Sequence, residues 1–272
     1  MVIPLRDDNP TTRTAFVTIA LIAVNIIIYL MQPHGGLAEQ EFLYKRAAVP
    51  CELTQRDPLT FYEANTGQCL SSSETDGVSP AIAPAKNIWI SVLTSMFLHA
   101  SILHVGGNML FLWIFGNNIE DRLGPVLFLL FYVATGIVAT ATHVAFQAAS
   151  TTPMIGASGA IAGVMGAYIV WFPRARVVTL VPLFVFFTMV NLPAVVLLGL
   201  WFGLQFLTNP NEGVAWLAHV GGFVSGAAIA YSIRGIFGPS AGALRMRRAP
   251  GRRPDGGEPS GGGFRGGYPG RF

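Results

Sequence analysis

The stretch Gly156-Ala157-Ser158-Gly159-Ala160-Ile161-Ala162-Gly163 places a serine among glycines and alanines at the start of an apolar run that continues to residue 172. This run predicts a helix in a lipid bilayer, where each polar side chain costs about 2–4 kcal/mol on insertion scales. Ser158, Ala162 and Gly166 recur every four residues, so the serine face carries small side chains and another helix can approach closely. The stretch therefore predicts a tightly packed helix whose serine has a chemical role.

The composition of the whole chain is that of an integral, multi-pass membrane protein. Of its 272 residues, 52% are hydrophobic and 11% are charged, and the mean hydropathy is +0.52. These values lie outside the range of soluble globular domains. Crossing a hydrocarbon core of about 30 Å takes about 20 helical residues. Apolar runs predict six spans, near residues 15–31, 92–115, 126–147, 157–172, 191–207 and 214–233. We therefore expect an all-α polytopic membrane protein, with a six-helix domain over residues 15–236.

The segment 177–207 is the hardest to assign, because its apolar residues are interrupted by Asn191 and Pro193. A helix usually ends or kinks ahead of a proline. We interpret residues 177–190 as an interfacial or re-entrant lead-in that is followed by one crossing.

The distribution of Lys and Arg predicts the orientation of the spans, because positive charge is retained on the cytoplasmic side. If the N-terminus is inside, the inner segments hold 13 of the 17 basic residues, and eight of these lie from Arg234 onward. The other four lie in the long first outer loop, residues 32–88, together with seven acidic residues. Both termini are therefore predicted to be cytoplasmic, with residues 1–14 as a short N-terminal segment.

Both cysteines of the chain, Cys51 and Cys69, lie in this outer loop. An exported loop is the compartment in which a disulfide forms. We predict a Cys51–Cys69 bridge as a hypothesis, and the alternative is two unpaired thiols in a mobile loop.

Residues 237–272 are rich in Gly, Pro and Arg and have too few apolar residues to build a core. They predict a disordered cytoplasmic tail, whose simplest role is a solubilising topology anchor. Its arginines could also bind anionic lipid headgroups, at about 1 kcal/mol each. RNA binding through arginine-glycine repeats is less favoured, and no specific nucleic-acid partner is expected.

Polar side chains from three predicted spans lie at similar depth near the outer face. His104 and Asn108 are in the outer half of the second span, Ser158 begins the fourth, and His219 lies within two turns of the start of the sixth. A lone serine or histidine in a membrane helix is usually a packing or hydrogen-bonding element, and we interpret His143 in this way. Convergence of several such groups at one depth instead predicts a site.

Helical spacing indicates that the serine and histidine meet. His219, Gly222 and Gly226 share one small-residue face, which can pack against the serine face. The imidazole nitrogen and the hydroxyl would then come within about 2.6–3.2 Å, the distance that general-base activation needs. Because the nearest preceding acid, Glu212, is seven residues from His219, we predict a Ser–His dyad without a carboxylate.

Acyl transfer through Ser158 also needs donors for the oxyanion of the tetrahedral intermediate. His104 and Asn108 lie one helical turn apart on one face, and both side chains carry N–H groups. The backbone N–H of Ser158 is a third candidate donor.

The chain resembles the rhomboid intramembrane serine proteases of prokaryotic type over about residues 90–235. Three motifs carry the resemblance: His99-Ala-Ser-Ile-Leu-His104-Val-Gly-Gly-Asn108 in the second span, Gly156-Ala-Ser158-Gly at the nucleophile, and Ala218-His219-Val-Gly-Gly222 in the sixth span.

The resemblance implies Ser158 as nucleophile, His219 as general base and three oxyanion-hole residues, which are His104, Asn108 and Gly156. It leaves His99, Gly159 and Gly222 as supporting residues. It further implies a water-filled cavity open to the outside, substrates that are single-span membrane proteins, and a location in a bacterial cell membrane. No cofactor is implied, and no set of His, Cys and acidic residues has the spacing of metal ligands.

Two positions depart from the family's pattern. The family often has an aromatic residue four positions after the serine, where this chain has Ala162, so the orientation of the His219 ring must come from elsewhere. The Trp-Arg pair common in the first outer loop is also missing, with only Trp89 near its place.

Two other functions compete with proteolysis. A catalytically inactive rhomboid-like protein would bind or escort membrane helices, but it would have no reason to keep Ser158 and His219 together. A transporter or channel predicts a polar path through both leaflets or an inverted repeat, and the sequence has neither.

Overall fold

The computed structural model describes residues 3–70, 79–183, 186–207 and 215–237. Apart from Phe237, the predicted disordered tail lies outside these residues. The described helices are α1 (Phe16–Met31), α2 (Gly36–Arg46), α3 (Pro50–Gln55), α4 (Phe61–Thr66), α6 (Ile88–Thr94), α7 (Ile102–Phe111), α8 (Asn117–Leu123), α9 (Pro125–Phe146), α10 (Ser158–Trp171), α11 (Ala194–Gln205) and α12 (Trp216–Ile233). Two further helical turns are η1 (Ser95–Phe97) and η2 (Leu112–Gly116), and the strands are β1 (Ile3–Asp7), β2 (Arg176–Leu183) and β3 (Phe186–Pro193).

Each of the six predicted apolar runs contains a helix, in the order α1, α7 with η2, α9, α10, α11 and α12. Among the described residues, α9 and α12 are long and apolar enough to cross a membrane by themselves. The segments Ile88–Phe97 and Ile102–Leu123 are bent by 81° and form a third candidate if they are counted as one span. The helices α1, α10 and α11 are apolar but shorter.

The helices α10 and α12 are in backbone contact. A Cβ atom added at Gly226 would lie 2.0 Å from the carbonyl oxygen of Gly163, and one at Gly222 would lie 2.0 Å from that of Gly159. No real Cβ atom comes so close to a backbone oxygen, so only glycine permits this approach. The small-residue faces that the sequence predicts are therefore the surfaces at which these two helices cross.

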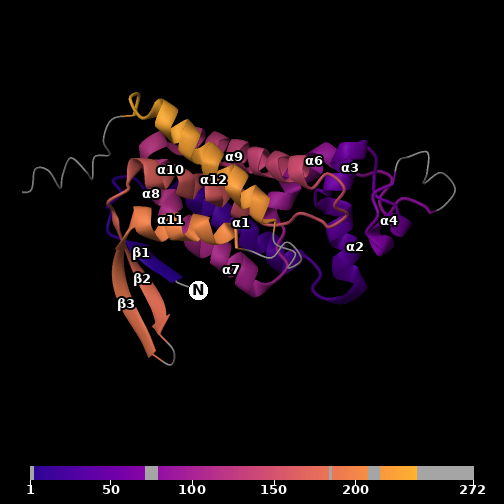
Figure 1. Ribbon diagram of the computed structural model, residues 1–272, viewed down its shortest axis with the longest axis horizontal. Coiled ribbons are helices and arrows are strands. Elements are labelled where there is room, and N and C mark those ends of the chain that lie inside the picture. The colour runs from indigo at the N-terminus through magenta and orange to yellow at the C-terminus, as the bar shows by residue number, and fades with distance from the viewer. Residues whose placement is uncertain (1–2, 71–78, 184–185, 208–214, 238–272) are drawn as a thin grey trace, which may run out of the picture.

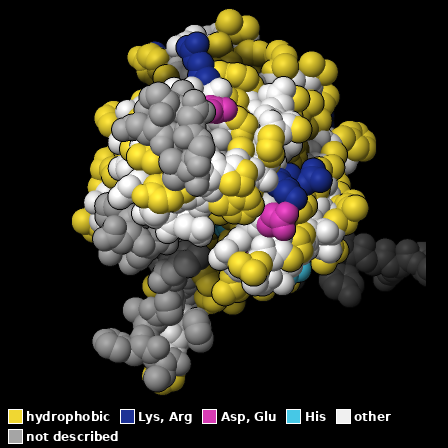
Figure 2. All heavy atoms as spheres, turned by 90° about the vertical axis from the view of Figure 1, so that its right-hand side faces the viewer, with side chains coloured by type: hydrophobic (Ala, Val, Ile, Leu, Met, Phe, Trp, Pro, Cys, Tyr) yellow, Lys and Arg dark blue, Asp and Glu magenta, His cyan; other side chains and the backbone are white. Residues whose placement is uncertain are grey.

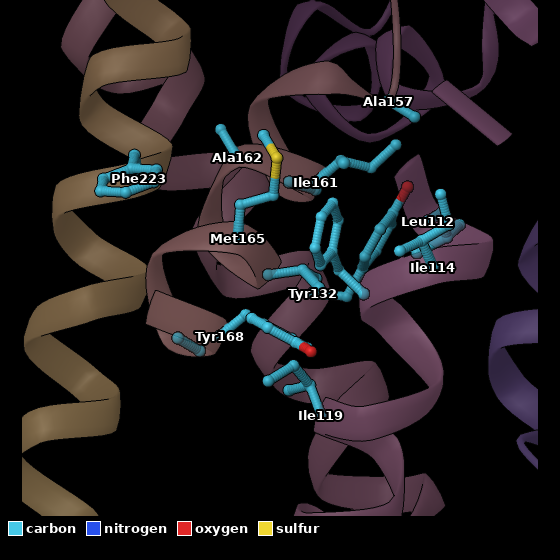
Figure 3. Close-up of a cluster of buried hydrophobic side chains, with 14 of the residues drawn as sticks. Leu112, Ile114, Ile119, Tyr132, Ala157, Ile161, Ala162, Met165, Tyr168 and Phe223 are labelled. Atoms are coloured by element: carbon cyan, nitrogen blue, oxygen red, sulfur yellow. The ribbon is translucent and has the colours of Figure 1, made fainter. Parts of the chain in front are cut away.

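The main core surrounds α10. Figure 3 shows side chains of α10 packed against those of α9, η2 and α8. The largest fully buried side chains there include Tyr132, Tyr168, Ile161 and Ile119. Burying a side chain of this size contributes about 1.5–3 kcal/mol, so this core holds α10 firmly against its neighbours.

The prediction of a purely helical chain is wrong at residues 177–190, although the fold is mostly helical as expected. Residues 177–183 and 186–190 belong to the antiparallel hairpin of β2 and β3, so the segment expected to lead into the fifth span has strand structure. The strand β1 pairs with β2 and completes a three-stranded sheet, which projects from the end of the bundle opposite α2, α3 and α4 (Figure 1). The β-branched run Val177-Val178-Thr179 favours strand, and Pro193 ends the hairpin and begins α11.

Two carboxylates hold the start of α1 at this end of the bundle. Glu120 is 3% exposed, and it accepts hydrogen bonds from the backbone N–H groups of Val17 at 2.9 Å and Thr18 at 2.7 Å. Asp121 accepts from the backbone of Thr12 and Arg13. Since the first turn of a helix has unpaired N–H groups and a partial positive charge, Glu120 on α8 caps α1, and Asp121 holds the segment that leads into it.

Asp7 ties the sheet to the core. Its Oδ2 atom accepts hydrogen bonds from the hydroxyl of Tyr168 at 2.5 Å and from Nδ2 of Asn118 at 2.7 Å. Burial raises the pKa of the Asp7 carboxyl from its ordinary value of 3.8 to about 6, against the opposing effect of these two hydrogen bonds.

We expect Asp7 to make the stability of the protein depend on pH. Because the pKa of Asp7 is raised in the folded state, its contribution to the free energy of unfolding is full below about pH 4 and is lost as the pH rises through about 6. Asp7→Asn keeps both acceptor bonds and cannot ionise. Thermal unfolding in detergent between pH 4 and 7 should show the wild type losing on the order of 1–2 kcal/mol relative to this variant, after allowance for partial exposure. If the free energies of unfolding of the two proteins changed in parallel with pH, the raised pKa assigned to Asp7 would be contradicted.

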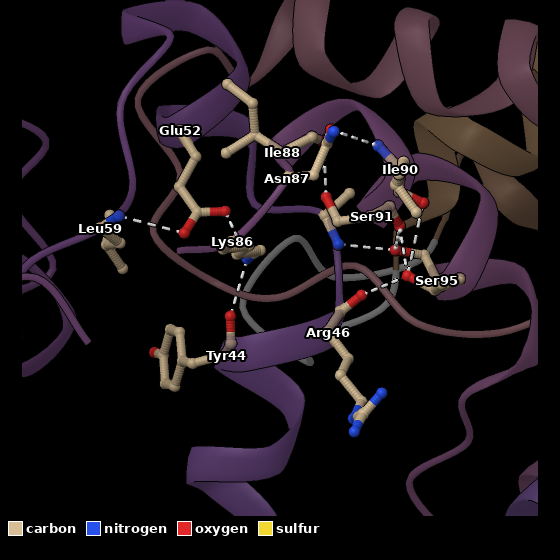
Figure 4. A network of polar contacts seen from close by, with 12 residues as sticks. Tyr44, Arg46, Glu52, Leu59, Lys86, Asn87, Ile88, Ile90, Ser91 and Ser95 are labelled. Atoms are coloured by element: carbon tan, nitrogen blue, oxygen red, sulfur yellow. Dashed lines mark hydrogen bonds and ion pairs between the residues drawn. The ribbon is translucent and has the colours of Figure 1, made fainter. Parts of the chain in front are cut away.

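The segment between α1 and α6 contains α2, α3 and α4, and a buried ion pair links α3 to Lys86 (Figure 4). Lys86 Nζ lies 2.5 Å from Glu52 Oε2, and it also donates to the carbonyl oxygen of Tyr44 at 2.7 Å. Burial lowers the pKa of Lys86 and raises that of Glu52. The negative charge of Glu52 opposes the first shift, and the positive charge of Lys86 opposes the second. A disulfide joins Cys51 to Cys69 in the same region, with Cα atoms 5.7 Å apart. Figure 2 shows that this end of the molecule carries only scattered charged side chains among hydrophobic and uncharged atoms.

Candidate active site

The serine and the histidine meet where α10 and α12 begin. Ser158 is the first residue of α10, and His219 lies one turn into α12. The crossing of these helices at Gly222 and Gly159 brings the two side chains together. The Oγ atom of Ser158 lies 2.8 Å from Nε2 of His219, a hydrogen-bond distance. Both residues are partly exposed.

Gly156 brings a third residue to the serine. It has a φ of +115°, which L side chains rarely adopt. A Cβ atom there would lie 2.9 Å from Nε2 and Cε1 of His104 and 3.6 Å from Oγ of Ser158. The space beside Gly156 is therefore bordered by the His104 ring and the Ser158 hydroxyl, and any larger residue would fill it.

The helix α7 supplies His104 and Asn108. The side chain of Ser101 caps this helix by accepting a hydrogen bond from the backbone N–H of His104 at 3.1 Å. Asn108 is 8% exposed, and its Nδ2 atom is buried without a hydrogen-bond partner among the described residues. An unpaired buried donor costs about 1–3 kcal/mol, and it is available to a negatively charged oxygen.

His99 lies beside His104 and does not approach the serine directly. It is fully buried, and its ring packs on that of His104 with centroids 5.0 Å apart in an edge-to-face arrangement. Gln32 at the end of α1 donates to the carbonyl oxygen of His99 at 2.5 Å. His99 thus occupies a supporting position behind the His104 ring.

Two residues at the site were missed by the sequence reasoning. Gln205 Oε1 lies 2.8 Å from Nδ1 of His219, and the ring of Trp201 lies 5.8 Å from the imidazole ring, centroid to centroid. Both belong to α11, one helical turn apart. The available signal was a single amide in an otherwise apolar run, four residues after a tryptophan. This signal is weak, because an amide is neither the carboxylate nor the aromatic residue that usually orients a catalytic imidazole.

Ala162 has a packing role here. It is fully buried at the crossing of α10 and α12, and an added Cβ atom at Gly222 would lie 3.3 Å from its own Cβ. The tight crossing needs a small side chain at this position.

Of the other candidate residues, none in the described part of the chain is hydrogen-bonded to Ser158 or His219. Glu212 is outside the described residues. The Nδ1 atom of His143 on α9 is buried without a hydrogen-bond partner in the part of the chain that the structure describes. In the same part of the chain, the one set of three potential metal ligands is Cys51, Glu63 and Cys69. Its two sulfur atoms form the disulfide and are not the thiolates that bind metals.

Comparisons with known proteins agree with these motifs. The family model of the Rhomboid domain matches residues 86–235, more than half of the chain. The Rhomboid protease GluP of Bacillus subtilis (strain 168) is 32% identical over 160 residues, which cover 57% of this chain and 29% of that protein. The mitochondrial presenilin-associated rhomboid-like protein of Bos taurus is 31% identical over 150 residues, 53% of this chain and 38% of that protein.

A third relative, the mitochondrial Rhomboid protein 1 of Saccharomyces cerevisiae, is 36% identical over 96 residues, 34% of this chain and 28% of that protein. The matched regions thus span only about a third of the length of these relatives. The residues matched by the family model include α7, α10 and α12, which carry the residues of the candidate site. The similarity to the family therefore covers the part of the chain that forms this site. The chain belongs to the rhomboid family.

Proposed function

We propose that this protein is an intramembrane serine endopeptidase that cleaves single-span membrane proteins in or near their membrane helix. The observation that carries the proposal is the 2.8 Å contact between Oγ of Ser158 and Nε2 of His219. A serine hydroxyl is a weak nucleophile unless a base removes its proton. An imidazole at this distance can do so.

The proposed reaction passes through an acyl-enzyme and needs no cofactor. Oγ of Ser158 attacks the carbonyl carbon of the scissile peptide, and its proton moves to Nε2 of His219. The tetrahedral intermediate collapses as His219 returns that proton to the leaving amine, which leaves an ester on Ser158. Water then attacks the ester with the same base, and the serine is restored.

We assign the oxyanion hole to His104, Asn108 and the space beside Gly156. The His104 ring borders this space together with the Ser158 hydroxyl, and Asn108 offers an unpaired buried N–H group. Donors that are already in place stabilise the oxyanion without reorganisation at the moment of reaction.

Asn108→Leu is therefore expected to lower kcat for a single-span reporter by about 100- to 1000-fold with little change in KM. Leucine has a similar volume and no donor, so the loss reports transition-state stabilisation. Asn25→Leu on α1 is the matched control, since it also replaces a fully buried asparagine and should leave kcat within a few-fold of the wild type. An Asn108→Leu enzyme with wild-type kcat would remove Asn108 from the oxyanion hole.

The protein is an integral membrane protein, as its composition predicts. We further propose six crossings with both termini in the cytoplasm and the enzyme in a cell membrane of bacterial type. The helix α10 has 14 residues and is about 21 Å long at 1.5 Å per residue. If its other end reaches the inner interface of a core of about 30 Å, Ser158 lies several ångströms below the outer one. Substrate helices would then have to expose their peptide bonds at that depth.

The direct test is cleavage of a purified single-span reporter in proteoliposomes that contain this protein as the only enzyme. The reporter carries helix-destabilising residues in the outer part of its span. We expect one principal cut, located by mass spectrometry within or beside the reporter span. An intact reporter that remains bound to the protein would instead favour a catalytically inactive rhomboid-like protein that binds or escorts membrane helices.

A further inference from the structure

Gln205, the last residue of α11, makes two hydrogen bonds that together fix the direction of its amide. Its side chain is buried at 8% exposure. Nε2 donates to the carbonyl oxygen of Trp201 at 3.1 Å, and Oε1 lies 2.8 Å from Nδ1 of His219. A carbonyl oxygen only accepts, so the NH₂ group must face Trp201 and the amide oxygen must face His219.

This direction determines the tautomer of His219. The amide oxygen of Gln205 also only accepts, so Nδ1 of the ring must carry the proton. In a neutral imidazole the lone pair is then on Nε2, the atom that lies 2.8 Å from Oγ of Ser158. The chain of contacts from Trp201 through Gln205 and His219 to Ser158 therefore has one consistent set of donors and acceptors.

We propose that Gln205 is a positioning residue, which holds His219 in the Nδ1–H tautomer and orients its ring toward Ser158. The inference rests on the proposed serine-protease function and adds a third member to the predicted dyad. The amide oxygen can also keep its bond to Nδ1–H in the imidazolium that forms when Ser158 attacks. A carboxylate would add a full negative charge at that step, so this site depends more on orientation and less on charge.

The helix α11 gives the ring a second contact. Trp201 lies one turn before Gln205, and its ring is tilted by 42° to the imidazole at 5.8 Å between centroids. The Trp201 ring also packs on Phe223 of α12, with centroids 6.2 Å apart. The orientation that an aromatic residue at position 162 would provide thus comes from α11.

No carboxylate is paired with His219 among the described residues. The titratable groups that interact with it electrostatically are the imidazoles of His104 on α7 and His143 on α9. A carboxylate introduced at position 205 would be in direct contact with the ring, without a second carboxylate paired to it among the described residues. A change in the pH–rate profile of cleavage can therefore be attributed to the new charge.

Three replacements of Gln205 separate positioning from packing. Gln205→Leu keeps the volume and removes the acceptor. Gln205→Asn keeps an amide that is one methylene too short to reach Nδ1. Gln205→Glu keeps both the length and the acceptor and adds a negative charge. Cleavage of the single-span reporter is measured from pH 5 to 9, and turnover is normalised to the number of active sites titrated with a fluorophosphonate probe.

We expect the Leu and Asn variants to lose about ten-fold in kcat with unchanged KM, as for the loss of one productive hydrogen bond. Gln205→Glu should recover most of kcat. It should also move the acidic limb of the pH–rate profile upward by about one unit, because a carboxylate beside the ring favours the imidazolium.

Wild-type kcat per titrated site in the Leu and Asn variants would overturn the inference, because a purely structural role changes only the number of folded sites. An unmoved acidic limb in a well-folded Gln205→Glu enzyme would also count against contact with His219. These results differ from failure of the proposed function, in which the wild type itself neither cleaves the reporter nor reacts with the probe.

Discussion

Ser158→Ala is expected to reduce cleavage of a single-span membrane reporter by about a million-fold, which is background in practice. Every covalent step of the proposed reaction forms or breaks a bond to Oγ of this residue. The donors contributed by His104 and Asn108 remain in the variant but have no tetrahedral intermediate to stabilise. Because alanine fits wherever serine does and favours helix, the folded structure and its thermal stability should be kept.

The matched control is Ser225→Ala on α12. The hydroxyl of Ser225 donates to the carbonyl oxygen of Gly222 in its own helix at 2.9 Å and has no part in the proposed reaction. Both variants are reconstituted at equal amounts with the same reporter, and initial rates are compared. Cleavage by Ser158→Ala at a rate near that of Ser225→Ala would end the protease assignment.

Gly226→Val is expected to have the largest effect on folding. A Cβ atom at position 226 would lie 2.0 Å from the carbonyl oxygen of Gly163. The oxygen is a backbone atom and the Cβ atom is fixed by the backbone of α12, so neither can move alone. The helices α10 and α12 must therefore separate. Overpacking in a close-packed core usually costs about 1–3 kcal/mol, and a clash with backbone should lie at or above the upper end of this range. The separation also carries His219 away from Ser158, so labelling by a fluorophosphonate should be lost together with stability.

Gly199→Ala is the control for this variant. Gly199 lies within α11, and apart from the adjacent residues and backbone of its own helix, no described atom lies within 4 Å of a Cβ atom placed there. This change should be neutral or slightly stabilising, because alanine favours helix by about 1 kcal/mol over glycine. Thermal unfolding in detergent and probe labelling are measured on both proteins. A Gly226→Val protein as stable and as reactive as Gly199→Ala would contradict the close approach of α10 and α12.

The helices and the pairing of Ser158 with His219 could be predicted because both depend on local pattern. Apolar runs give the helices, and the spacing of Gly222 and Gly226 gives the face on which α12 meets α10. The position of His104 near Ser158 could also be predicted, because the two residues lie at the same end of neighbouring helices.

The expectation of an all-α chain failed at the β2–β3 hairpin for a physical reason. A short run that is mostly apolar has no period that separates a strand from a buried helix. The deciding features were the β-branched run at Val177 and Val178 and the pairing of β2 with β1, which lies some 170 residues earlier in the chain. Long-range pairing of this kind cannot be inferred from the run itself.

Gln205 was missed because its role exists only once α11 has packed. Its amide lies in an apolar run that could face lipid, another helix or the site, and one sequence does not distinguish these cases. The expectation of an aromatic residue at position 162 also came from the resemblance and not from this chain. Here the narrow crossing of α10 and α12 requires Ala162, and α11 supplies both Trp201 and Gln205 to the histidine.

The most direct test of the central claim, that His219 activates Ser158, is covalent labelling of the purified protein with a fluorophosphonate, followed by peptide mapping. The predicted result is a single adduct on Ser158 of the wild type, formed at least 100-fold more slowly in His219→Ala, roughly the loss expected when general-base catalysis is removed. A wild type that forms no adduct, or an adduct on Ser158 that forms equally fast without His219, would contradict the account.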